Sequence, residues 1–414
     1  MQGRVFDNLE QLLEPCLAGE FLASSWGKSY RHVRGWPGKF SQLLPWNHLN
    51  EILGQHRLDF PRLRLTQDGR SLPSSAYLRH TVAGRRKVSI PRILPAELTA
   101  QLRQGATLVL DAVDELHRPL TELAAGLERT FHVRAQINVY AGWRTSRGFD
   151  LHWDDHDVFI LQVAGQKRWS LYGMTRPFPL TGEQAEKPSG APLWEETLTD
   201  GDLLYIPRGW WHVALPLNEP TLHLTVGIHN PTGIELLRWL TERMRASETF
   251  RMDLPRFASA RERAVHLQRM RAELLAEWGA DLLERYQSAT DAAAEARPQL
   301  SLPWSATPET LPPGQDVRLR LTAPRPLELN TKAQPDAEHP GRETRTVEFS
   351  CLGKRWRFAA AAIHLLRPLG DAAPHSVSEL LEAASGKLDE QTVRAFLGEL
   401  LAHGLLAVVR ESQT

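Results

Sequence analysis

The chain has 414 residues, of which 42% are hydrophobic, and its 49 lysines and arginines balance 49 aspartates and glutamates. This length suits two to three domains of about 150 residues, and the balanced charge disfavours wholesale disorder and a globally basic nucleic-acid binder. Cys16 and Cys351 stand far apart without a CxxC pair, which argues against a disulfide framework and a cysteine zinc site. Because the sequence shows neither a signal peptide nor an apolar run of about 18 residues, we expect a cytoplasmic protein without membrane contact.

Short apolar runs separated by turn residues occupy the segment from about residue 106 to residue 228. Turn signals such as Asp200-Gly201-Asp202 recur between them, and this alternation predicts a β-sandwich or jelly roll. The pattern changes at Thr232, which forms a helix-capping signature with Glu235. A second signature of this kind, at Ser259, precedes one amphipathic stripe of apolar residues that continues toward residue 296, so we expect at least two helices here.

Nine of the 28 prolines fall between Pro298 and Pro340, which predicts a linker. Beyond it, the apolar runs 347–351 and 355–358 flank a turn and predict a hairpin. Three helices should follow, from about residues 359, 376 and 389, before a last apolar strand at 405–409. This order of elements looks like a winged helix-turn-helix domain.

The strongest chemical signal is the pair His152 and Asp154, because residues two apart in a strand point to the same face. His212 follows 60 residues after His152, at the end of a strand and turn. Two histidines and one carboxylate on one face leave three metal positions open, as in non-haem Fe(II) oxygenases. An H-x-D alone is weak evidence, and the alternative is a histidine and an aspartate in ordinary hydrogen bonds.

Lys167 adds to that signal, because it lies within an apolar hairpin and a buried lysine is costly without an anion. Strand alternation predicts that Lys167 points inward with Trp169 and Leu171 and leaves Arg168 outside. A dicarboxylate co-substrate would supply the anion. The alternative is a solvated cation beside Arg168.

Together these motifs resemble the JmjC-type ribosomal oxygenases, which are cupin-like protein hydroxylases dependent on Fe(II) and 2-oxoglutarate. The resemblance implies that His152, Asp154 and His212 bind the iron, that Lys167 pairs with the far carboxylate of 2-oxoglutarate, and that O2 takes a remaining position. It also implies that three polar residues on nearby strands contact the co-substrate: Asn138, Tyr140 and Thr225. The alternative for each is a buried polar side chain whose hydrogen bonds are made within the protein.

The resemblance further implies an α+β fold around a double-stranded β-helix, a homodimer, and hydroxylation of an arginine or histidine in a ribosomal protein. It divides the chain into four parts: a JmjC/cupin-like catalytic domain with a helical N-terminal region at 1–231, a helical dimerisation region at 232–297, a proline-rich linker at 298–341, and a winged-helix domain at 342–414. No motif matches at 142–146 and 175–196, where we expect substrate choice to be decided.

Other functions are compatible with parts of this site. A tailoring hydroxylase of a biosynthetic peptide or a demethylase would use the same metal, whereas a regulator would sense a ligand in the barrel and bind DNA through the winged helix. The last predicted helix argues against specific DNA binding, because its sequence contains one arginine, Arg394, and three acidic residues. His156 is expected on the face of His152, in a structural role or hydrogen-bonded to a metal ligand, and Trp210 and Trp211 are expected in packing.

Overall fold

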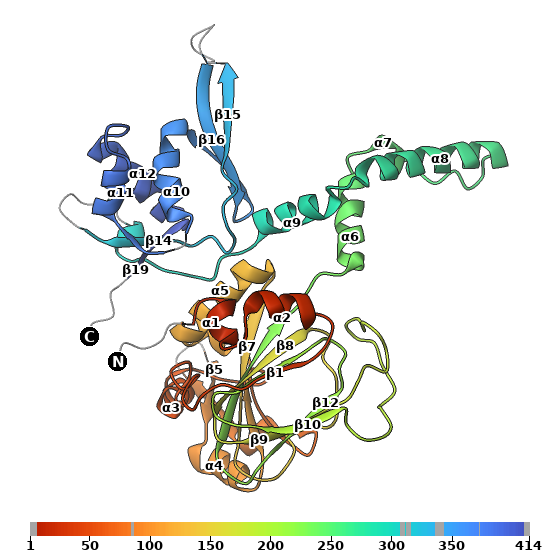
Figure 1. Ribbon diagram of the computed structural model, residues 1–414, viewed down its shortest axis with the longest axis vertical. Coiled ribbons are helices and arrows are strands. Elements are labelled where there is room, and N and C mark those ends of the chain that lie inside the picture. The colour runs from red at the N-terminus through yellow and green to blue at the C-terminus, as the bar shows by residue number, and fades with distance from the viewer. Residues whose placement is uncertain are drawn as a thin grey trace. The chain divides into compact units, whose positions relative to one another are not determined.

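The computed structural model describes residues 6–83, 87–306, 311, 316–335, 343–371 and 373–409. The chain divides into two units, and the boundary in the sequence lies between Asn230 and Pro231 (Figure 1). No helix among the described residues is both long enough and apolar enough to cross a membrane.

The first unit is built from antiparallel strands and short helices. Its helices are α1 (Leu9–Leu13), α2 (Ala18–Ser24), α3 (Trp46–Gln55), α4 (Pro95–Arg103) and α5 (Arg118–Phe131), with 3-10 turns η1 (Ser74–Ala76) and η2 (Val113–Glu115). Its strands are β1 (Arg31–Val33), β2 (Leu63–Gln67), β3 (Arg70–Ser71), β4 (Leu78–Ala83), β5 (Val88–Ile93), β6 (Thr107–Leu110), β7 (Ala135–Gly142), β8 (Asp157–Ala164), β9 (Lys167–Leu171), β10 (Trp194–Leu198), β11 (Leu203–Ile206), β12 (His212–Pro216) and β13 (Thr221–Ile228).

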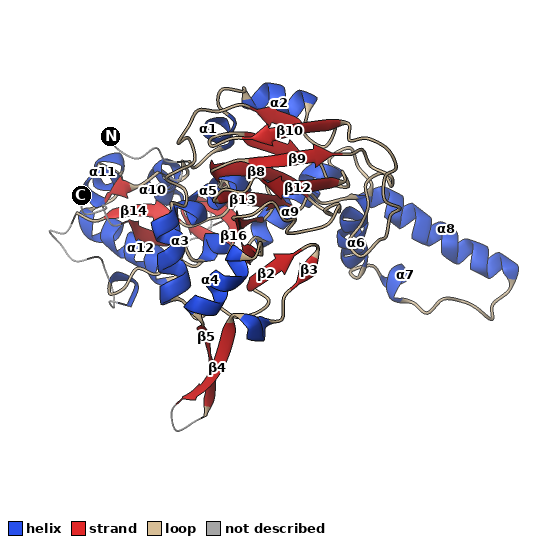
Figure 2. Cartoon of the chain, turned by 90° about the horizontal axis from the view of Figure 1, so that it is seen from below, coloured by secondary structure: helices blue, strands red, loops and turns tan. Residues whose placement is uncertain are grey.

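Two sheets organise these strands. The larger has the order β1-β11-β8-β13-β7-β6-β2-β3, and the smaller has the order β10-β9-β12. Among the described residues, strands β4 and β5 pair with each other alone, and they form a hairpin that projects from the sheets (Figure 2). Two antiparallel sheets with these crossovers form the jelly-roll core that the sequence predicts.

Strand β8 is buried on both faces, which explains its continuous apolar sequence. Its side chains at Phe159 and Leu161 join the large core that includes helices α1, α2 and α5, whereas Val158 and Ile160 join a second core with the smaller sheet. Strand β9 shows the alternation that the sequence predicts, because Lys167, Trp169 and Leu171 are buried while Arg168 is exposed.

The second unit carries the remaining elements. Its helices are α6 (Gly233–Met244), α7 (Glu248–Arg251), α8 (Ala260–Glu277), α9 (Leu282–Ala293), α10 (Ile363–Leu369), α11 (Val377–Ala383) and α12 (Glu390–Ala402), with 3-10 turns η3 (Trp304–Ala306) and η4 (Ala360–Ala362). Its strands are β14 (Arg318–Leu321), β15 (Asn330–Pro335), β16 (Glu343–Cys351), β17 (Lys354–Ala359), β18 (His375–Ser376) and β19 (Leu406–Val409).

Local sequence signals at helix starts and at the hairpin are confirmed. Thr232, Ser259 and Ser376 each cap a helix in a complete capping box. Asp389 caps α12 through the backbone N–H of Thr392. Strands β16 and β17 form the expected hairpin, and β19 forms the expected last strand. Caps and turns depend on neighbours in the sequence, which is why they can be predicted from it.

Two expectations in the second unit differ from the structure. The predicted stripe toward residue 296 is not one helix, because the chain leaves the helix at Trp278 and restarts at Leu282. The predicted linker 298–341 contains β14, which pairs with β18 and β19, and β15, which pairs with β16. Leu319 on β14 is fully buried in the core of this unit, so hydrophobic burial fixes part of this proline-rich segment.

Candidate active site

A cavity of about 240 Å³ lies in the first unit and is lined by side chains from both sheets. Its wall combines apolar side chains with a few polar and charged groups, which is the usual composition of a small-molecule site. The lining residues are Arg64, Thr107, Tyr140, Gly148, Phe149, His152, Asp154, Ile160, Lys167, Trp169, His212, Ala214, His223 and Thr225.

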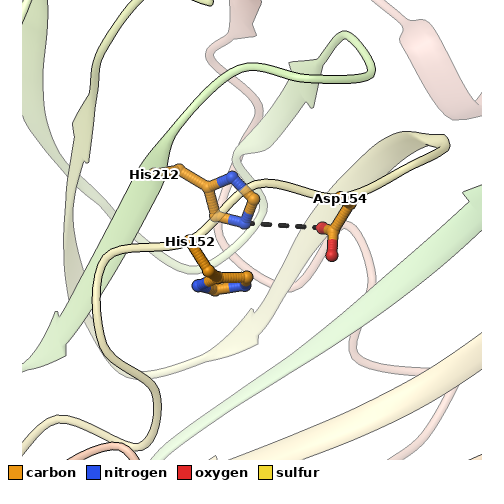
Figure 3. A group of neighbouring side chains, drawn as sticks. All are labelled: His152, Asp154 and His212. Carbon is orange, nitrogen blue, oxygen red and sulfur yellow. Dashed lines mark ion pairs between the residues drawn. The ribbon is translucent and has the colours of Figure 1, made fainter. Parts of the chain in front are cut away.

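The predicted triad lines this cavity, and its three side chains come together (Figure 3). One ligand atom from each of His152, Asp154 and His212 lies within 4.8 Å of the others. Nε2 of His212 is 3.5 Å from a carboxylate oxygen of Asp154, and the two imidazole centroids are 4.3 Å apart. Two imidazoles and one carboxylate therefore face one small volume.

Backbone hydrogen bonds hold the H-x-D segment against β12. The N–H of His152 donates to the carbonyl of His212 at 3.2 Å, and the N–H of His212 donates back at 2.7 Å. Gly209 donates its N–H to the carbonyl of Asp154 at 2.9 Å. The expectation that His152 and Asp154 share a strand is wrong, because the pair lies in a loop that makes one isolated bridge before β8 begins. The bridge, rather than strand alternation, brings the pair to His212.

Both histidines of the triad are oriented by their Nδ1 atoms. Nδ1 of His152 lies 2.8 Å from the carbonyl of Asp150, and Nδ1 of His212 lies 3.0 Å from the carbonyl of Trp210. A carbonyl can only accept, so each Nδ1 carries the proton and each Nε2 keeps its lone pair for a metal. Burial, together with the nearby imidazole of His152, lowers the pKa of His212 to about 4, so it is the neutral ring that metal binding needs.

Lys167 lies in the same cavity and is 7% exposed. No hydrogen bond or ion pair joins its ammonium to another residue of the described ranges, and its Nζ lies 5.6 Å from the centroid of Trp169. Burial lowers the pKa of Lys167 to about 7. A desolvated ammonium without a carboxylate partner is the feature expected of a site that receives an anion.

Other polar atoms of the cavity wall also lack partners. They are Nε of Arg64, Oγ1 of Thr107, Nε1 of Trp169 and Nδ1 of His223, and none of these atoms has a partner among the described residues. Buried polar groups are normally satisfied, so a group of unsatisfied ones around a buried lysine indicates a bound polar molecule. The residues present therefore suit a metal at the triad and a carboxylate-bearing ligand beside Lys167.

The three additional positions differ in where they point. Tyr140 and Thr225 line the cavity, and burial raises the pKa of the Tyr140 hydroxyl. Asn138 does not line the cavity. Its Oδ1 accepts from the backbone N–H of Ala112 at 2.9 Å and from the side chain of Gln136 at 3.0 Å. Asn138 thus supports the wall rather than forming it.

Several cavity residues were not anticipated from the sequence. His223 is buried and stacks on Tyr140 with ring centroids 4.9 Å apart. It lies two residues before Thr225 on β13, so strand alternation could have identified it. Arg64 could not be found in this way, because it comes from the distant strand β2, where it forms two hydrogen bonds with Asp111 at 2.8 and 2.9 Å.

The residues next to the metal ligands in the sequence have structural contacts of their own. His156 lies with its Nδ1 3.0 Å from Asp155. Trp211 is buried and donates to Thr175, and Trp210 packs against the core between the two sheets, so both tryptophans have the packing role that was expected.

Comparison with known proteins shows what the chain is similar to. Residues 116–236 match the family described as the JmjC domain. The bifunctional lysine-specific demethylase and histidyl-hydroxylase NO66 of Drosophila pseudoobscura pseudoobscura is 31% identical over 237 residues, which are 53% of this chain and 23% of that protein. Its counterpart in Drosophila melanogaster is 28% identical over 240 residues, 53% of this chain and 33% of that protein. The chain thus spans about a quarter to a third of the length of these relatives.

Solved structures extend the similarity in fold. YcfD, a ribosomal oxygenase from Escherichia coli, aligns with a TM-score of 0.55 and 17% identity over 95% of this chain and 98% of its own. YcfD in complex with cobalt and 2-oxoglutarate aligns with the same score and the same coverage, at 16% identity. At these identities the likeness establishes the fold. Residues 116–236 therefore resemble the JmjC domain and the chain shares the fold of these structures, in agreement with the resemblance to the JmjC-type oxygenases.

Proposed function

We propose that this protein is an Fe(II)- and 2-oxoglutarate-dependent oxygenase that hydroxylates an amino-acid side chain of a protein. The observation that carries the proposal is one cavity whose wall holds both the triad of His152, Asp154 and His212 and the ammonium of Lys167, which has no partner among the described residues. The JmjC domain match and the YcfD complex with cobalt and 2-oxoglutarate support this combination of ligands.

The triad residues would hold the metal. His152 and His212 offer Nε2 lone pairs and Asp154 offers a carboxylate oxygen, which leaves three of six octahedral positions open. Bound Fe(II), with 2-oxoglutarate and O2, supplies the oxidising power to insert an oxygen atom into a C–H bond. The backbone bridge between His152 and His212 keeps the donors in place before any ligand arrives.

Lys167 would hold the far carboxylate of 2-oxoglutarate through a charge-assisted hydrogen bond. The hydroxyls of Tyr140 and Thr225 and the imidazole of His223 offer further polar contacts in the same wall. Ile160, together with the other apolar wall residues, excludes water around the ammonium and so strengthens its attraction to the anion.

The substrate we propose is an arginine or histidine side chain of a ribosomal protein, which places the reaction in the cytoplasm. The names of the similar proteins support this assignment, since one is a histidyl-hydroxylase and another a ribosomal oxygenase. Mass spectrometry of ribosomal proteins from wild-type and deletion cells should reveal a residue that lacks one oxygen atom in the deletion strain. Purified protein with Fe(II) and 2-oxoglutarate should restore it, and identical ribosomal proteins in the two strains would contradict the assignment.

Demethylation of lysine is the second candidate, because the matched NO66 proteins are named as demethylases as well as hydroxylases. The same cavity could serve it, since both reactions begin with oxidation of a C–H bond. The mass change separates them: a hydroxylated peptide gains one oxygen atom, whereas a demethylated peptide loses one carbon and two hydrogens. A methylated lysine peptide that loses this mass with the protein, and a ribosomal peptide that does not change, would favour the demethylase.

We also propose that the protein is a homodimer that pairs through α6 to α9. Several apolar side chains on these helices and their connections are exposed, which is costly unless another chain covers them. They include Ile234, Leu237, Phe257, Leu267, Leu275, Trp278 and Leu283.

Light scattering of the full chain should give a dimer mass. Leu267→Glu combined with Leu275→Glu should give a monomer, whereas Leu300→Glu, at an exposed position outside these helices, should leave the dimer intact. A monomer mass for the wild-type protein at micromolar concentration would contradict the proposal.

For the C-terminal part we propose a winged-helix domain that does not read DNA. Helices α10 to α12 with the sheet β18-β14-β19 support the winged-helix assignment. On α12, Arg394 is buried and its Nε donates to Glu390 at 2.7 Å, so this arginine is engaged within the helix. A gel-shift experiment at about 150 mM salt should show no sequence discrimination, and discrimination that vanished in Arg394→Ala would overturn the proposal.

A further inference from the structure

A second group of two histidines and one aspartate lies in the first unit, and we propose that it binds one divalent transition-metal ion of the zinc class. The group consists of Asp155, His156 and His229, whose ligand atoms lie within 4.8 Å of one another. The donors are of the same types as in the triad, but none is shared with it. This inference does not depend on the proposed function.

The strand register brings the two imidazoles together. Strands β8 and β13 are antiparallel, and their last paired residues are Asp157 and Ile228. His156 precedes this pair and His229 follows it, so they occupy the next cross-strand position, where side chains are neighbours. Their ring centroids lie 4.3 Å apart. The pairing of two strands, and not a chance encounter of surface loops, thus places both rings.

A buried carboxylate fixes this end of the two strands. Asp157 is 4% exposed, and its oxygens accept from the hydroxyl of Tyr205 at 2.6 Å and from the side-chain amide of Asn230 at 2.5 Å. Since Asp157 follows His156 and Asn230 follows His229, these bonds hold both histidine backbones. A metal site gains affinity when its ligands are held by such supporting hydrogen bonds.

The orientation of His156 directs one nitrogen toward the group. A Cβ atom at Gly227 would come within 2.8 Å of Cδ2 and 2.9 Å of Nε2 of His156, so this edge of the ring rests on the glycine. The opposite edge places Nδ1 3.0 Å from Oδ1 of Asp155. The other oxygen of Asp155 accepts from the hydroxyl of Thr181 at 2.6 Å. Oδ1 and Nδ1 are therefore close enough for one ion beside them to contact both atoms.

The site can take up an ion from solvent. Asp155 and His156 are half-buried, whereas His229 is exposed. Zinc binds imidazole nitrogen and carboxylate oxygen at about 2.0 to 2.2 Å, so its ligands are at most about 4.4 Å apart. Small side-chain movements would close the present arrangement onto an ion, and water would complete a tetrahedron. Thr181 belongs to the long segment between β9 and β10. An ion bound to Asp155 would therefore be linked to this segment through the hydrogen bond between Asp155 and Thr181.

Equilibrium dialysis of the full chain tests the proposal. Protein stripped by a chelator is dialysed against Zn²⁺ alone, and bound zinc is counted by elemental analysis. His156→Asn combined with His229→Asn should bind one ion fewer than the wild-type protein. His152→Ala combined with His212→Ala should retain the ion that the first pair of substitutions removes. Equal zinc content in the wild-type protein and the His156/His229 variant would overturn the proposal, whatever the triad binds.

Two further variants protect the test against misfolding and non-specific binding. His229→Asn alone changes an exposed side chain and should weaken zinc binding at this site at least about tenfold. His80→Asn is the matched control, because His80 also lies beside an aspartate, with Nε2 2.8 Å from Asp59, but belongs to no group of three such ligands among the described residues. It should leave the zinc content unchanged, and an equal loss in His80→Asn and His229→Asn would contradict a specific site.

Discussion

Two parts of the cavity wall are built in different ways: the metal triad, which we call the metal end, and the polar groups around Lys167, which we call the anion end. At the metal end, His152 and Asp154 come from one loop and His212 from the strand to which that loop is bonded. At the anion end, Lys167 comes from β9, and the other polar groups come from β7 and β13. Backbone hydrogen bonds between the loop and the segment 209–212 therefore hold the metal end, whereas the anion end exists only when β9 of the smaller sheet packs against β7 and β13 of the larger.

Burial acts on both ends with opposite consequences. It lowers the pKa of His212 to about 4 and the pKa of Lys167 to about 7. A metal needs the neutral imidazole, so the shift prepares His212 for its role at every pH near neutrality. An anion needs the ammonium, so the same effect makes Lys167 depend on a proton in this pH range. The comparison predicts a metal end that is ready and an anion end that is sensitive to pH.

The largest expected effect comes from breaking the metal end. His152→Ala, Asp154→Ala or His212→Ala each removes one of three ligands and should reduce Fe(II)-dependent turnover of 2-oxoglutarate more than about 100-fold. Succinate formation measures this loss, and circular dichroism should show an unchanged fold, since the bridge between residues 152 and 212 uses backbone atoms. Full activity in any one of the three variants would exclude that residue as a ligand.

The next effect comes from breaking the anion end. Lys167→Ala removes a charge-assisted bond of about 1.5 to 3 kcal/mol, so the concentration of 2-oxoglutarate needed for half-maximal turnover should rise about 10- to 150-fold. Arg168→Ala is the matched control, because this neighbour on β9 is exposed and should leave the requirement unchanged. If Lys167→Ala and the wild-type protein needed the same concentration of 2-oxoglutarate, another residue would have to bind the far carboxylate.

A pH series sharpens the contrast between the ends. The pKa of Lys167 is lowered to about 7 in the empty cavity, so above this pH the lysine is neutral and must take up a proton when the anion binds. The dissociation constant of 2-oxoglutarate should rise about tenfold per pH unit above 7 and level off below 7. Calorimetry in buffers of different ionisation enthalpy should show proton uptake at pH 8 and little at pH 6. A flat profile in the wild-type protein would contradict the assignment.

The same contrast explains what the sequence could reveal. The spacing of His152 and Asp154, a later histidine and a lysine at an inward strand position are short-range signals, and each led to a cavity residue. Arg64 and Thr107 lie on β2 and β6, which reach the cavity because they pair with other strands of the larger sheet. Their spacing from the other site residues in the sequence therefore gives no signal. Asn138 lies on the same strand as Tyr140, but its side-chain oxygen accepts a hydrogen bond from the backbone N–H of Ala112.

Long-range packing also explains the differences in the fold. The prolines between residues 298 and 340 suggest a linker because they interrupt regular structure, yet β14 occurs among them and completes a sheet with β18 and β19. Helix starts were predictable, since Thr232 and Ser259 cap their helices through nearby residues. The break at Trp278 was not, because the apolar pattern continues across it.

A smaller effect is expected at Thr225. Thr225→Val keeps the shape of the side chain and removes the hydroxyl from the cavity wall, which should raise the 2-oxoglutarate requirement about 2- to 10-fold. Thr221→Val is the control, because Thr221 lies on the same strand but bonds to Gln162 outside the cavity lining. It should change stability and not the 2-oxoglutarate requirement, and equal requirements for both variants would remove Thr225 from the site.

The smallest effect on the co-substrate is expected at Asn138, because it supports the wall without forming it. Asn138→Ala leaves the backbone N–H of Ala112 without its acceptor, so the free energy of unfolding should fall by about 1 kcal/mol in a denaturant titration. The 2-oxoglutarate requirement should change no more than about threefold. Gln136→Ala, which removes an exposed partner of Asn138, should change neither quantity appreciably. An increase as large as that of Lys167→Ala would place Asn138 in direct contact with the anion.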